Sequence, residues 1–298
     1  MKQLIYLSLS IFLLFACTEK SNRHTNAETE GFTFVFMTDV HISTEHRSTE
    51  GFKQAIDTIN SLNPDFVLSG GDNINDALAL SYEASDSVYK LFVNTAKNLK
   101  SPFYSTMGNH EVFGLYEASG VSPSHEEYGK QLYQNRIAKR YYSFDHKNWH
   151  FVVLDGIGLT EDRHYYGHVD EEQLEWLKAD LEKAGKKPIA VSIHMPLFSI
   201  GSQIMQRPTA GMAETSIVTN ANQVREILEQ YNTKVVFQGH LHFLEDIEYN
   251  GIHYITGGAV CSQWWQGKRF GLEEGFLKVD VNGEDFSWNY IDYGWEVQ

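Results

Sequence analysis

The chain has 298 residues, enough for one large domain or two ordinary ones, and 42% of them are hydrophobic while 21% are charged. This balance is typical of a globular protein and excludes an intrinsically disordered one. The formal net charge of −15 disfavours nucleic acid as a partner, because neutralising phosphates requires Lys and Arg in excess.

Residues 1–16 contain one lysine followed by an uncharged run from Leu4 to Ala16. The run is shorter than the ~20 apolar residues of a membrane-spanning helix and predicts a signal peptide. It ends in LFAC, which resembles a bacterial lipoprotein signal whose cysteine, here Cys17, receives the lipid. We therefore expect export, a lipid anchor in the bacterial cell envelope and a polar tether over 17–31. Plain secretion with an incidental cysteine is the alternative.

Residues 32–298 alternate apolar strands with amphipathic helices, which predicts one mixed α/β domain. The expected strands cover 32–39, 65–72, 102–110, 140–146, 149–156, 187–196 and 234–242. The expected helices lie near 50–62, 82–98, 170–185 and 219–230. We expect an irregular segment over 111–139 and several short strands from 244 to 297.

Most of these strands end in potential metal ligands or other polar residues. The residues are Asp39, His41, Asp72, Asn109, His110, Glu111, His194, His240 and His242. A lone histidine after a strand is more often structural than a ligand. Five ligand-bearing ends of the same polarity favour one shared site, because the carboxyl ends of strands line the site in open α/β sheets.

The residue types at these ends favour a pair of metal ions. Two divalent cations ~3.5–4 Å apart repel each other and need an anionic bridge, which one aspartate can supply. Imidazole, carboxylate and amide ligands suit Zn, Fe or Mn. No cysteine stands near any of the motifs in the sequence, which excludes a structural Cys-rich zinc site.

As an ordered set, DVH, GGDN, GNHE, HMP and GHLH resemble the motif series of the calcineurin-like metallophosphoesterases, over about residues 34–242. The resemblance implies a four-layer α/β/β/α sandwich with two mixed β-sheets and two transition-metal ions. One ion would be bound by Asp39, His41 and His242, and the second by Asn109, His194 and His240. Asp72 would bridge the two ions. His110 would contact the phosphate and protonate the leaving oxygen.

The activity implied is hydrolysis of a small-molecule phosphodiester or phosphomonoester by a hydroxide that bridges the metals. Two divalent ions, two carboxylates and this hydroxide sum to about +1, which attracts a phosphate even in an acidic protein. Asn75 stands where the resembling purple acid phosphatases have an iron-binding tyrosine, whereas Glu111 does occur in that branch. A purple-acid-phosphatase-like monoesterase stays an alternative. So does an inactive binding lipoprotein, although Asp72 and His110 are both present.

Three further residues are weaker candidates for substrate contact. Trp264 and Trp265 are expected either to form a stacking wall beside the substrate or to fill the outer core of a sheet. Arg163 either grips a phosphate or lies solvated in its loop. The segment from Val112 to Arg140 is long enough for a lid, or is an exposed insertion. The oligomeric state stays open.

Overall fold

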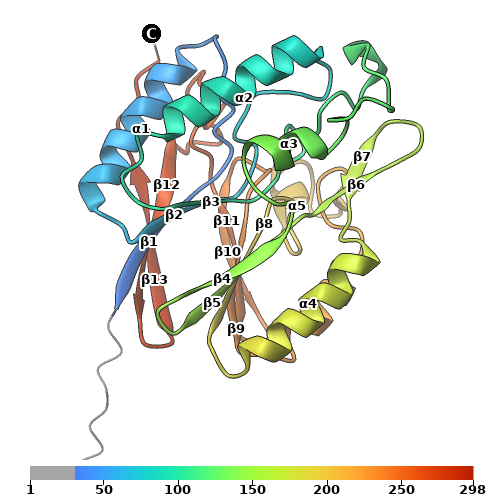
Figure 1. The fold of residues 1–298 in the computed structure, drawn as a ribbon. Coiled ribbons are helices and arrows are strands. Elements are labelled where there is room, and N and C mark those ends of the chain that lie inside the picture. The colour runs from blue at the N-terminus through green and yellow to red at the C-terminus, as the bar shows by residue number, and fades with distance from the viewer. Residues whose placement is uncertain (1–30, 298) are drawn as a thin grey trace, which may run out of the picture.

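The computed structural model describes residues 31–297. The predicted signal peptide, Cys17 and the predicted tether up to residue 30 lie outside the described residues, so these stay predictions. Two β-sheets pack face to face, and helices cover the outer face of each sheet (Figure 1). The expected four-layer α/β/β/α sandwich with two mixed sheets is therefore confirmed.

The first sheet has the strand order β13-β12-β1-β2-β3. Its strands are β1 (Phe32–Met37), β2 (Phe66–Ser69), β3 (Phe103–Ser105), β12 (Gly275–Asn282) and β13 (Asp285–Asp292). β1, β2 and β3 are parallel, while β12 and β13 add antiparallel pairs at one edge. Helices α1 (Ser48–Leu62) and α2 (Tyr82–Ala96) connect the parallel strands and cover the outer face.

The second sheet has the order β10-β11-β9-β8-β5-β4. Its strands are β4 (Tyr142–His146), β5 (Trp149–Leu154), β8 (Ile189–Ile193), β9 (Thr233–Gln238), β10 (Leu244–Tyr249) and β11 (Ile252–Gly257). The central strands β5, β8, β9 and β11 are parallel, and β4 and β10 are antiparallel edges. The connecting helices are α4 (Glu171–Ala184) and α6 (Ala221–Leu228).

The remaining elements are short and differ from the sequence-based expectation. They are η1 (Glu117–Ser119), α3 (Gln131–Arg136), β6 (Ile157–Leu159), β7 (Tyr165–Gly167) and α5 (Gly201–Met205). Segments of three to six residues contain less than two helical turns, so they show no readable periodicity. Conversely, β12 and β13 have eight residues each and are longer than the short strands expected there.

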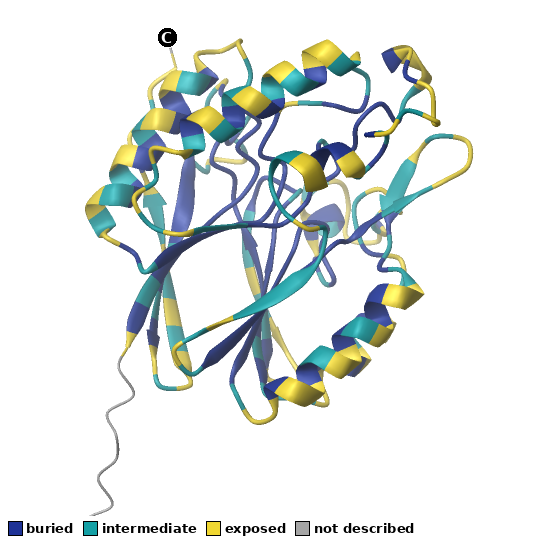
Figure 2. Ribbon diagram, in the orientation of Figure 1, coloured by how far each residue is buried: buried dark blue, intermediate teal, exposed yellow. Residues whose placement is uncertain are grey.

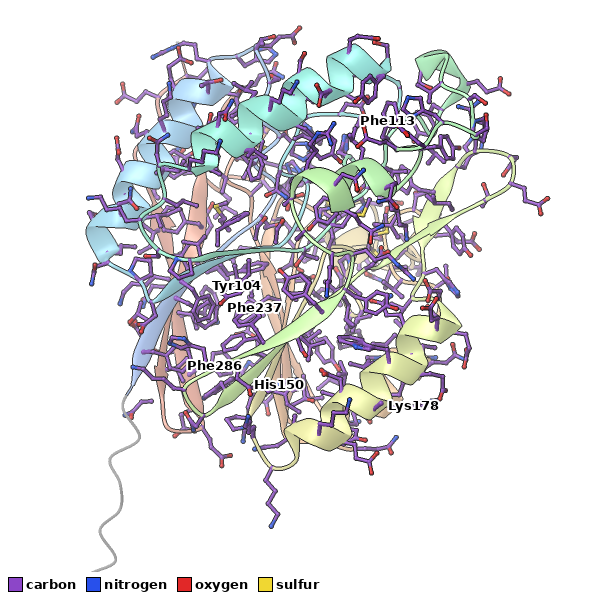
Figure 3. All side chains as sticks on the ribbon, in the orientation of Figure 1. Tyr104, Phe113, His150, Lys178, Phe237 and Phe286 are labelled. Carbon is purple, nitrogen blue, oxygen red and sulfur yellow. The ribbon has the colours of Figure 1, made fainter. Side chains whose placement is uncertain are left out.

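Alternating side chains of the strands build two cores. In β1, Phe34 and Phe36 face the opposite sheet, while Val35 and Met37 pack under the helices. The inter-sheet core is aromatic: the ring centroids of Phe34 and Phe237 lie 5.6 Å apart, nearly perpendicular. Figure 3 shows Phe237 and Tyr104 between the sheets, and Figure 2 shows the central strands as buried, whereas edge strands such as β4 and β13 are partly exposed.

Helix α4 illustrates how local signals set the boundaries of an element. The Asp170 carboxylate accepts a hydrogen bond from the backbone N–H of Gln173, and acidic residues follow in the first turn. Gly185 ends the helix with a positive φ of 67°. Within residues 31–297, no helix combines the length and the apolar character needed to cross a membrane.

Candidate metal centre

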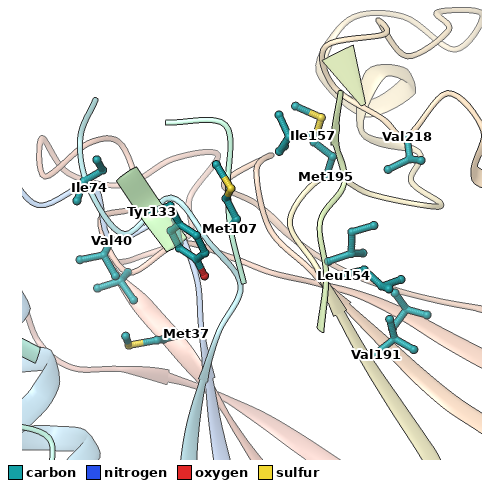
Figure 4. Packing of buried hydrophobic residues seen from close by; sticks show 14 of the residues in the cluster. Met37, Val40, Ile74, Met107, Tyr133, Leu154, Ile157, Val191, Met195 and Val218 are labelled. Carbon is teal, nitrogen blue, oxygen red and sulfur yellow. The ribbon is translucent and has the colours of Figure 1, made fainter. Parts of the chain in front are cut away.

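The loops after five parallel strands meet at the carboxyl edges of the two sheets. The loop after β1 runs alongside the loop after β2: the N–H of Asp39 donates to Gly71 O at 2.9 Å, and that of His41 to Asp72 O at 3.0 Å. Apolar residues of the loops, including Val40 and Met195, are fully buried and fix them in the core (Figure 4). The neighbouring polar side chains are thereby directed into one site.

The backbone at this edge is unusual. Five of the predicted ligands have φ between 45° and 71°, a region that costs free energy for side chains other than glycine: Asp39, His41, Asp72, His240 and His242. The neighbouring Trp264 and Trp265 have φ in the same range. Such strain persists where the surroundings enforce it, and it is concentrated at functional sites.

One half of the site is formed by Asp39, His41 and His242. The Nε2 atoms of His41 and His242 lie 3.0 Å apart. Asp39 Oδ1 lies 3.3 Å from His242 Nε2 and 3.8 Å from His41 Nε2. Two imidazole nitrogens this close, with a carboxylate beside them, can bind one cation, since metal–nitrogen bonds are ~2.0–2.1 Å long.

The other half is formed by Asp72, His194, His240 and Asn109. Asp72 Oδ2 lies 3.0 Å from His194 Nε2, and one ligand atom from each of Asp72, His194 and His240 lies within 4.8 Å of the others. Asn109 is buried, and neither atom of its amide group has a partner within the described residues. Asp72 Oδ2 also lies 3.7 Å from His41 Nε2, so Asp72 stands between the two halves.

Backbone carbonyls orient three of these imidazoles. His194 Nδ1 bonds to Gly70 O at 2.8 Å, His242 Nδ1 to Ser262 O at 2.7 Å, and His240 Nε2 to Thr215 O at 2.9 Å. Each carbonyl accepts a hydrogen bond from one ring N–H, which fixes the ring so that its other nitrogen faces the site. This arrangement is typical of metal-binding histidines, whose second nitrogen is held by an acceptor outside the metal's own ligands.

The protonation states of Asp39, Asp72, His41 and His240 suit cation binding. Burial opposes ionisation of Asp39 and Asp72, but the surrounding imidazoles outweigh it and hold the pKa of both carboxyl groups well below its usual range. Burial lowers the pKa of His41 and of His240 to about 4, so both rings are neutral. For His194, burial opposes protonation, yet the Asp72 carboxylate raises the pKa to about 9.

The donor set fits two transition-metal ions. Buried polar atoms without a hydrogen-bond partner are rare, yet His194 Nε2 and the Asn109 Oδ1 and Nδ2 atoms are all unpartnered within the described residues. Two carboxylates, four imidazoles and one amide oxygen also make the mixed nitrogen and oxygen set that Zn, Fe and Mn accept. The predicted ligands are thus brought together.

His110 lies at the open side of the site. Its side chain is 26% exposed, with Nε2 4.0 Å from Asp72 Oδ2 and Nδ1 3.6 Å from Asp76 Oδ1. Burial opposes protonation of His110, but Asp72 and Asp76 raise its pKa above the ordinary value. His110 is the predicted acid, and its ring is accessible from the open side of the site.

Glu111 organises the site, a role that the sequence did not reveal. Its Oε1 accepts from the N–H groups of Asn73 and Ile74 at 2.6 and 3.4 Å. Its Oε2 accepts from those of Asp72 and Gly108 at 3.0 and 2.7 Å. Burial and the nearby Asp72 raise the pKa of Glu111 to about 7. One carboxylate therefore ties together the loops that hold Asp72 and Asn109.

The two adjacent tryptophans have different environments. The Trp264 ring stacks on His242 with centroids 4.4 Å apart and lies 5.7 Å from the His41 ring. Trp265 is 3% exposed, and its indole N–H donates to Val40 O at 3.0 Å. Trp264 lies beside the metal site, where a stacking wall was one expectation. Trp265 fills the core, which was the other expectation.

Arg163 does not point into the site. Its Nε donates to Leu115 O at 2.7 Å. One terminal nitrogen donates to the carbonyls of Gly114, Tyr116 and Val121 at 2.7, 3.2 and 3.0 Å. The interpretation of Arg163 as a phosphate contact is therefore corrected: its guanidinium anchors the segment 114–121, because four carbonyls already accept its hydrogen bonds.

Cys261 is close to the centre in space, although it is remote from the motifs in the sequence. Its Sγ lies 3.8 Å from His242 Nδ1, and with His41 and His242 it forms a group whose ligand atoms lie within 4.8 Å. Burial raises the pKa of the thiol well above its ordinary value, so the thiol stays neutral. The folded chain therefore does bring one cysteine close to the motifs, and the expectation that none lies near them is wrong. A Cys-rich zinc site stays excluded, since it needs several cysteines.

Comparisons with known proteins agree with this geometry. The family model of the calcineurin-like phosphoesterases matches residues 32–244. A probable cyclic nucleotide phosphodiesterase of Xenorhabdus bovienii is 25% identical over 229 residues, covering 77% of this chain and 78% of that protein. Human tartrate-resistant acid phosphatase type 5 is 23% identical over 286 residues, covering 83% of this chain and 81% of the phosphatase.

A solved structure supports the fold. A dimetal phosphatase from Danio rerio superposes with a TM-score of 0.60 at 16% identity, covering 88% of this chain and 99% of that one. The family model spans most of the chain, including every strand that delivers a predicted ligand. The chain therefore belongs to the calcineurin-like phosphoesterases, hydrolases of phosphate esters that use two transition-metal ions.

Proposed function

We propose that this chain is an exported, lipid-anchored hydrolase of small-molecule phosphate esters, with phosphodiesters as the first class to test. Asp39, His41 and His242 would hold one metal ion, Asn109, His194 and His240 would hold the second, and Asp72 would contribute to both. The observation that carries the assignment is the convergence of these side chains. It includes the 3.0 Å contacts between His41 and His242 and between Asp72 and His194.

Two transition-metal ions held by these residues would supply positive charge to the phosphate oxygens and would lower the pKa of a water to near neutrality. The protein itself contributes electrostatic stabilisation. The buried carboxylates and imidazoles fix the position of the charge without reorganising during the reaction, which is the main source of electrostatic stabilisation in enzymes. The stacked Trp264 ring holds His242 in place and limits water on that side.

His110 donates the proton to the leaving alcohol. Its backbone N–H is fixed by Asp72 Oδ1 at 2.9 Å, while its partly exposed ring faces the open side of the site. A positioned general acid contributes roughly 10²–10⁴ in rate. We place His110 on the leaving-group side for this reason.

Two observations favour a phosphodiesterase over a purple-acid-phosphatase-like monoesterase. Asn75 occupies the position of the iron-binding tyrosine of that branch and is exposed. The Xenorhabdus relative is named for phosphodiester hydrolysis, with similar coverage of both chains. The human relative is named as an acid phosphatase, so the monoesterase stays an alternative, which the assay below also tests.

The test combines metal analysis with hydrolysis of bis(p-nitrophenyl) phosphate, p-nitrophenyl phosphate and cyclic AMP. We expect two transition-metal ions per chain and the highest turnover with a diester. Asp72→Ala should lose metal and turnover together, whereas His110→Ala should keep the metals and lose rate by roughly 10²-fold or more. Full activity of either variant would refute the assignment, and an inactive wild type with metals bound would support the binding lipoprotein.

The location rests on the sequence of residues 1–17 and the polar segment that follows. Expression with a labelled fatty acid should give a labelled, membrane-associated protein. Replacement of Cys17 by Ser should remove both the label and the membrane association. Label retained without Cys17 would contradict the anchor.

A further inference from the structure

β6 and β7 form a two-stranded hairpin at the ligand-bearing edge of the second sheet (Figure 1). The hairpin begins at Ile157, directly after the short loop that follows β5. β5 pairs in parallel with β8, and the predicted ligand His194 comes directly after β8. Parallel strands place their carboxyl ends at the same edge of a sheet, so the hairpin starts beside the candidate metal centre.

The carboxyl end of the hairpin is held next to another predicted ligand. The N–H of Gly167, the last residue of β7, donates to Glu214 O at 2.7 Å. The following residue of that segment, Thr215, accepts a hydrogen bond from His240 Nε2 at 2.9 Å through its carbonyl oxygen. Tyr165 lies two residues before Gly167, on the same face of β7. One segment therefore fixes both the end of β7 and the ring of His240.

Tyr165 and Tyr166 point to opposite faces of the hairpin, because successive side chains of a strand alternate. Tyr165 shares a face with its cross-strand partner Leu159, and both side chains pack against the core beneath the helices. On the other face, Tyr166 pairs with Gly158, and its ring centroid lies 5.4 Å from that of His168. Tyr165 is therefore the tyrosine that is turned toward the body of the protein.

The Tyr165 hydroxyl group is free to bond a ligand. It has no hydrogen-bond partner within residues 31–297, and those residues do not enclose it. Burial raises the pKa of Tyr165 above its ordinary value, and the neighbouring Tyr116 phenol and the Asp72 and Asp76 carboxylates raise it further. The phenol therefore keeps its proton and acts as a neutral donor.

The charge of Asp72 relates the phenol to the metal centre. Asp72 is buried between the two halves of the centre, with its Oδ2 atom 3.0 Å from His194 Nε2. Its carboxylate raises the pKa of Tyr165 more than the carboxylate of Asp76 does, which lies next to Nδ1 of the proposed acid. Tyr165 therefore lies within electrostatic reach of the centre itself.

An oxygen of the substrate's phosphate is the acceptor that suits this donor. The phosphate would lie at the metal centre, and its oxygens carry negative charge. A hydrogen bond to a charged oxygen is roughly twice as strong as one between neutral groups. A neutral phenol also forms no ion pair with the carboxylates around it, so it stays available to the phosphate.

We propose that Tyr165 is a further substrate-binding residue, whose O–H donates a hydrogen bond to an oxygen of the phosphate. The proposal rests on the proposed function in one respect, because it takes the metal centre as the site of the phosphate. It moves the phosphate contact first expected of Arg163 to a residue two positions later in the same hairpin. The alcohol of the ester takes no part in it, so free inorganic phosphate should make the same contact.

Tyr165→Phe removes the hydroxyl group and keeps the ring that packs against the core. Tyr166→Phe makes the same change one residue later, on the opposite face of the hairpin, and is the matched control. Each metal-loaded variant is titrated with inorganic phosphate by calorimetry. Tyr165→Phe should weaken phosphate binding by roughly tenfold or more, whereas Tyr166→Phe should change it by about twofold or less.

Two further measurements separate a ligand contact from a structural role. Metal content and the urea concentration at the unfolding midpoint should match the wild type in both variants, because the packing of the rings is unchanged. The value of kcat/KM for bis(p-nitrophenyl) phosphate should fall by roughly tenfold or more in Tyr165→Phe, because the contact persists in the transition state. A loss of metal in Tyr165→Phe would overturn the proposal.

The outcomes distinguish this proposal from the proposed function. A wild type that binds phosphate and hydrolyses no ester contradicts the proposed function alone, since the contact of Tyr165 is still measured by phosphate binding. A wild type that binds no phosphate contradicts this proposal. Equal phosphate affinities of Tyr165→Phe and Tyr166→Phe contradict it as well.

Discussion

Replacing Glu111 by Gln tests whether one carboxylate holds the metal-binding loops together. The side chain is fully buried and accepts four backbone N–H groups, two at each oxygen. Glutamine has nearly the same shape, but its NH₂ group must face one of the two pairs. Each choice leaves two buried N–H groups without an acceptor.

The expected cost follows from those two groups. A buried donor left unpaired costs about 1–3 kcal/mol, so the pair costs about 2–6 kcal/mol in the free energy of unfolding. This is a large fraction of a typical total stability of about 5–15 kcal/mol. The variant should also bind metal more weakly, because the N–H of Asp72 is one of the four donors.

The assay is urea unfolding in the presence of a chelator, so that loss of metal does not add to the difference. Glu274→Gln is the control: Glu274 is equally buried, but its Oε1 has no partner within the described residues. We expect Glu274→Gln to be close to neutral. Equal unfolding free energies for the two variants, within about 1 kcal/mol, would refute the role given to Glu111.

Three further predictions test the surroundings of the site. Gly108→Ala should reduce the metal content, because a Cβ there would lie 2.1 Å from Asp72 Oδ1; Gly211→Ala, with nothing within 4 Å, should leave metal content unchanged. Arg163→Ala should lower the free energy of unfolding in urea but leave KM for p-nitrophenyl phosphate unchanged, and a raised KM would restore Arg163 as a phosphate contact. His150 bonds Asp145 and Asp180 through its two ring nitrogens at 2.8 and 2.9 Å; burial opposes protonation, yet both carboxylates raise its pKa. Protonated His150 therefore contributes fully to the free energy of unfolding below the pKa of about 6.5 that it has in the unfolded chain, and this contribution is lost as pH rises through its pKa in the folded protein. In urea unfolding, His150→Gln should lower the free energy of unfolding more at pH ~6 than at pH ~9. Equal decreases at the two pH values would contradict this.

The ligand set could be predicted because each ligand stands within a few residues after the end of an apolar strand. The strands ending before Asp39, Asp72, Asn109, His194 and His240 are marked by runs of apolar residues, and parallel strands place such ends at one edge. The order of the motifs then indicated the family, whose model matches residues 32–244. The assignment of each ligand to its metal stays a proposal.

Other parts of the site depend on contacts between distant segments. Glu111 accepts from residues that lie both beside it and nearly forty positions earlier, so its motif alone does not show what it binds. Trp264 and Trp265 are neighbours in the chain, yet one stacks on His242 and the other fills the core. Arg163 is held by carbonyls more than forty positions away.

The amino-acid sequence by itself determined the long helices, the strands that carry the ligands, the sheet-edge position of the ligands and the acidic net charge. These follow from hydrophobic periodicity and composition, which are properties of neighbouring residues. Only the tertiary structure decided which loop side chains face the candidate metal centre and which face the core. Those choices are set by packing and hydrogen bonds between residues far apart in the chain, and no local pattern records them.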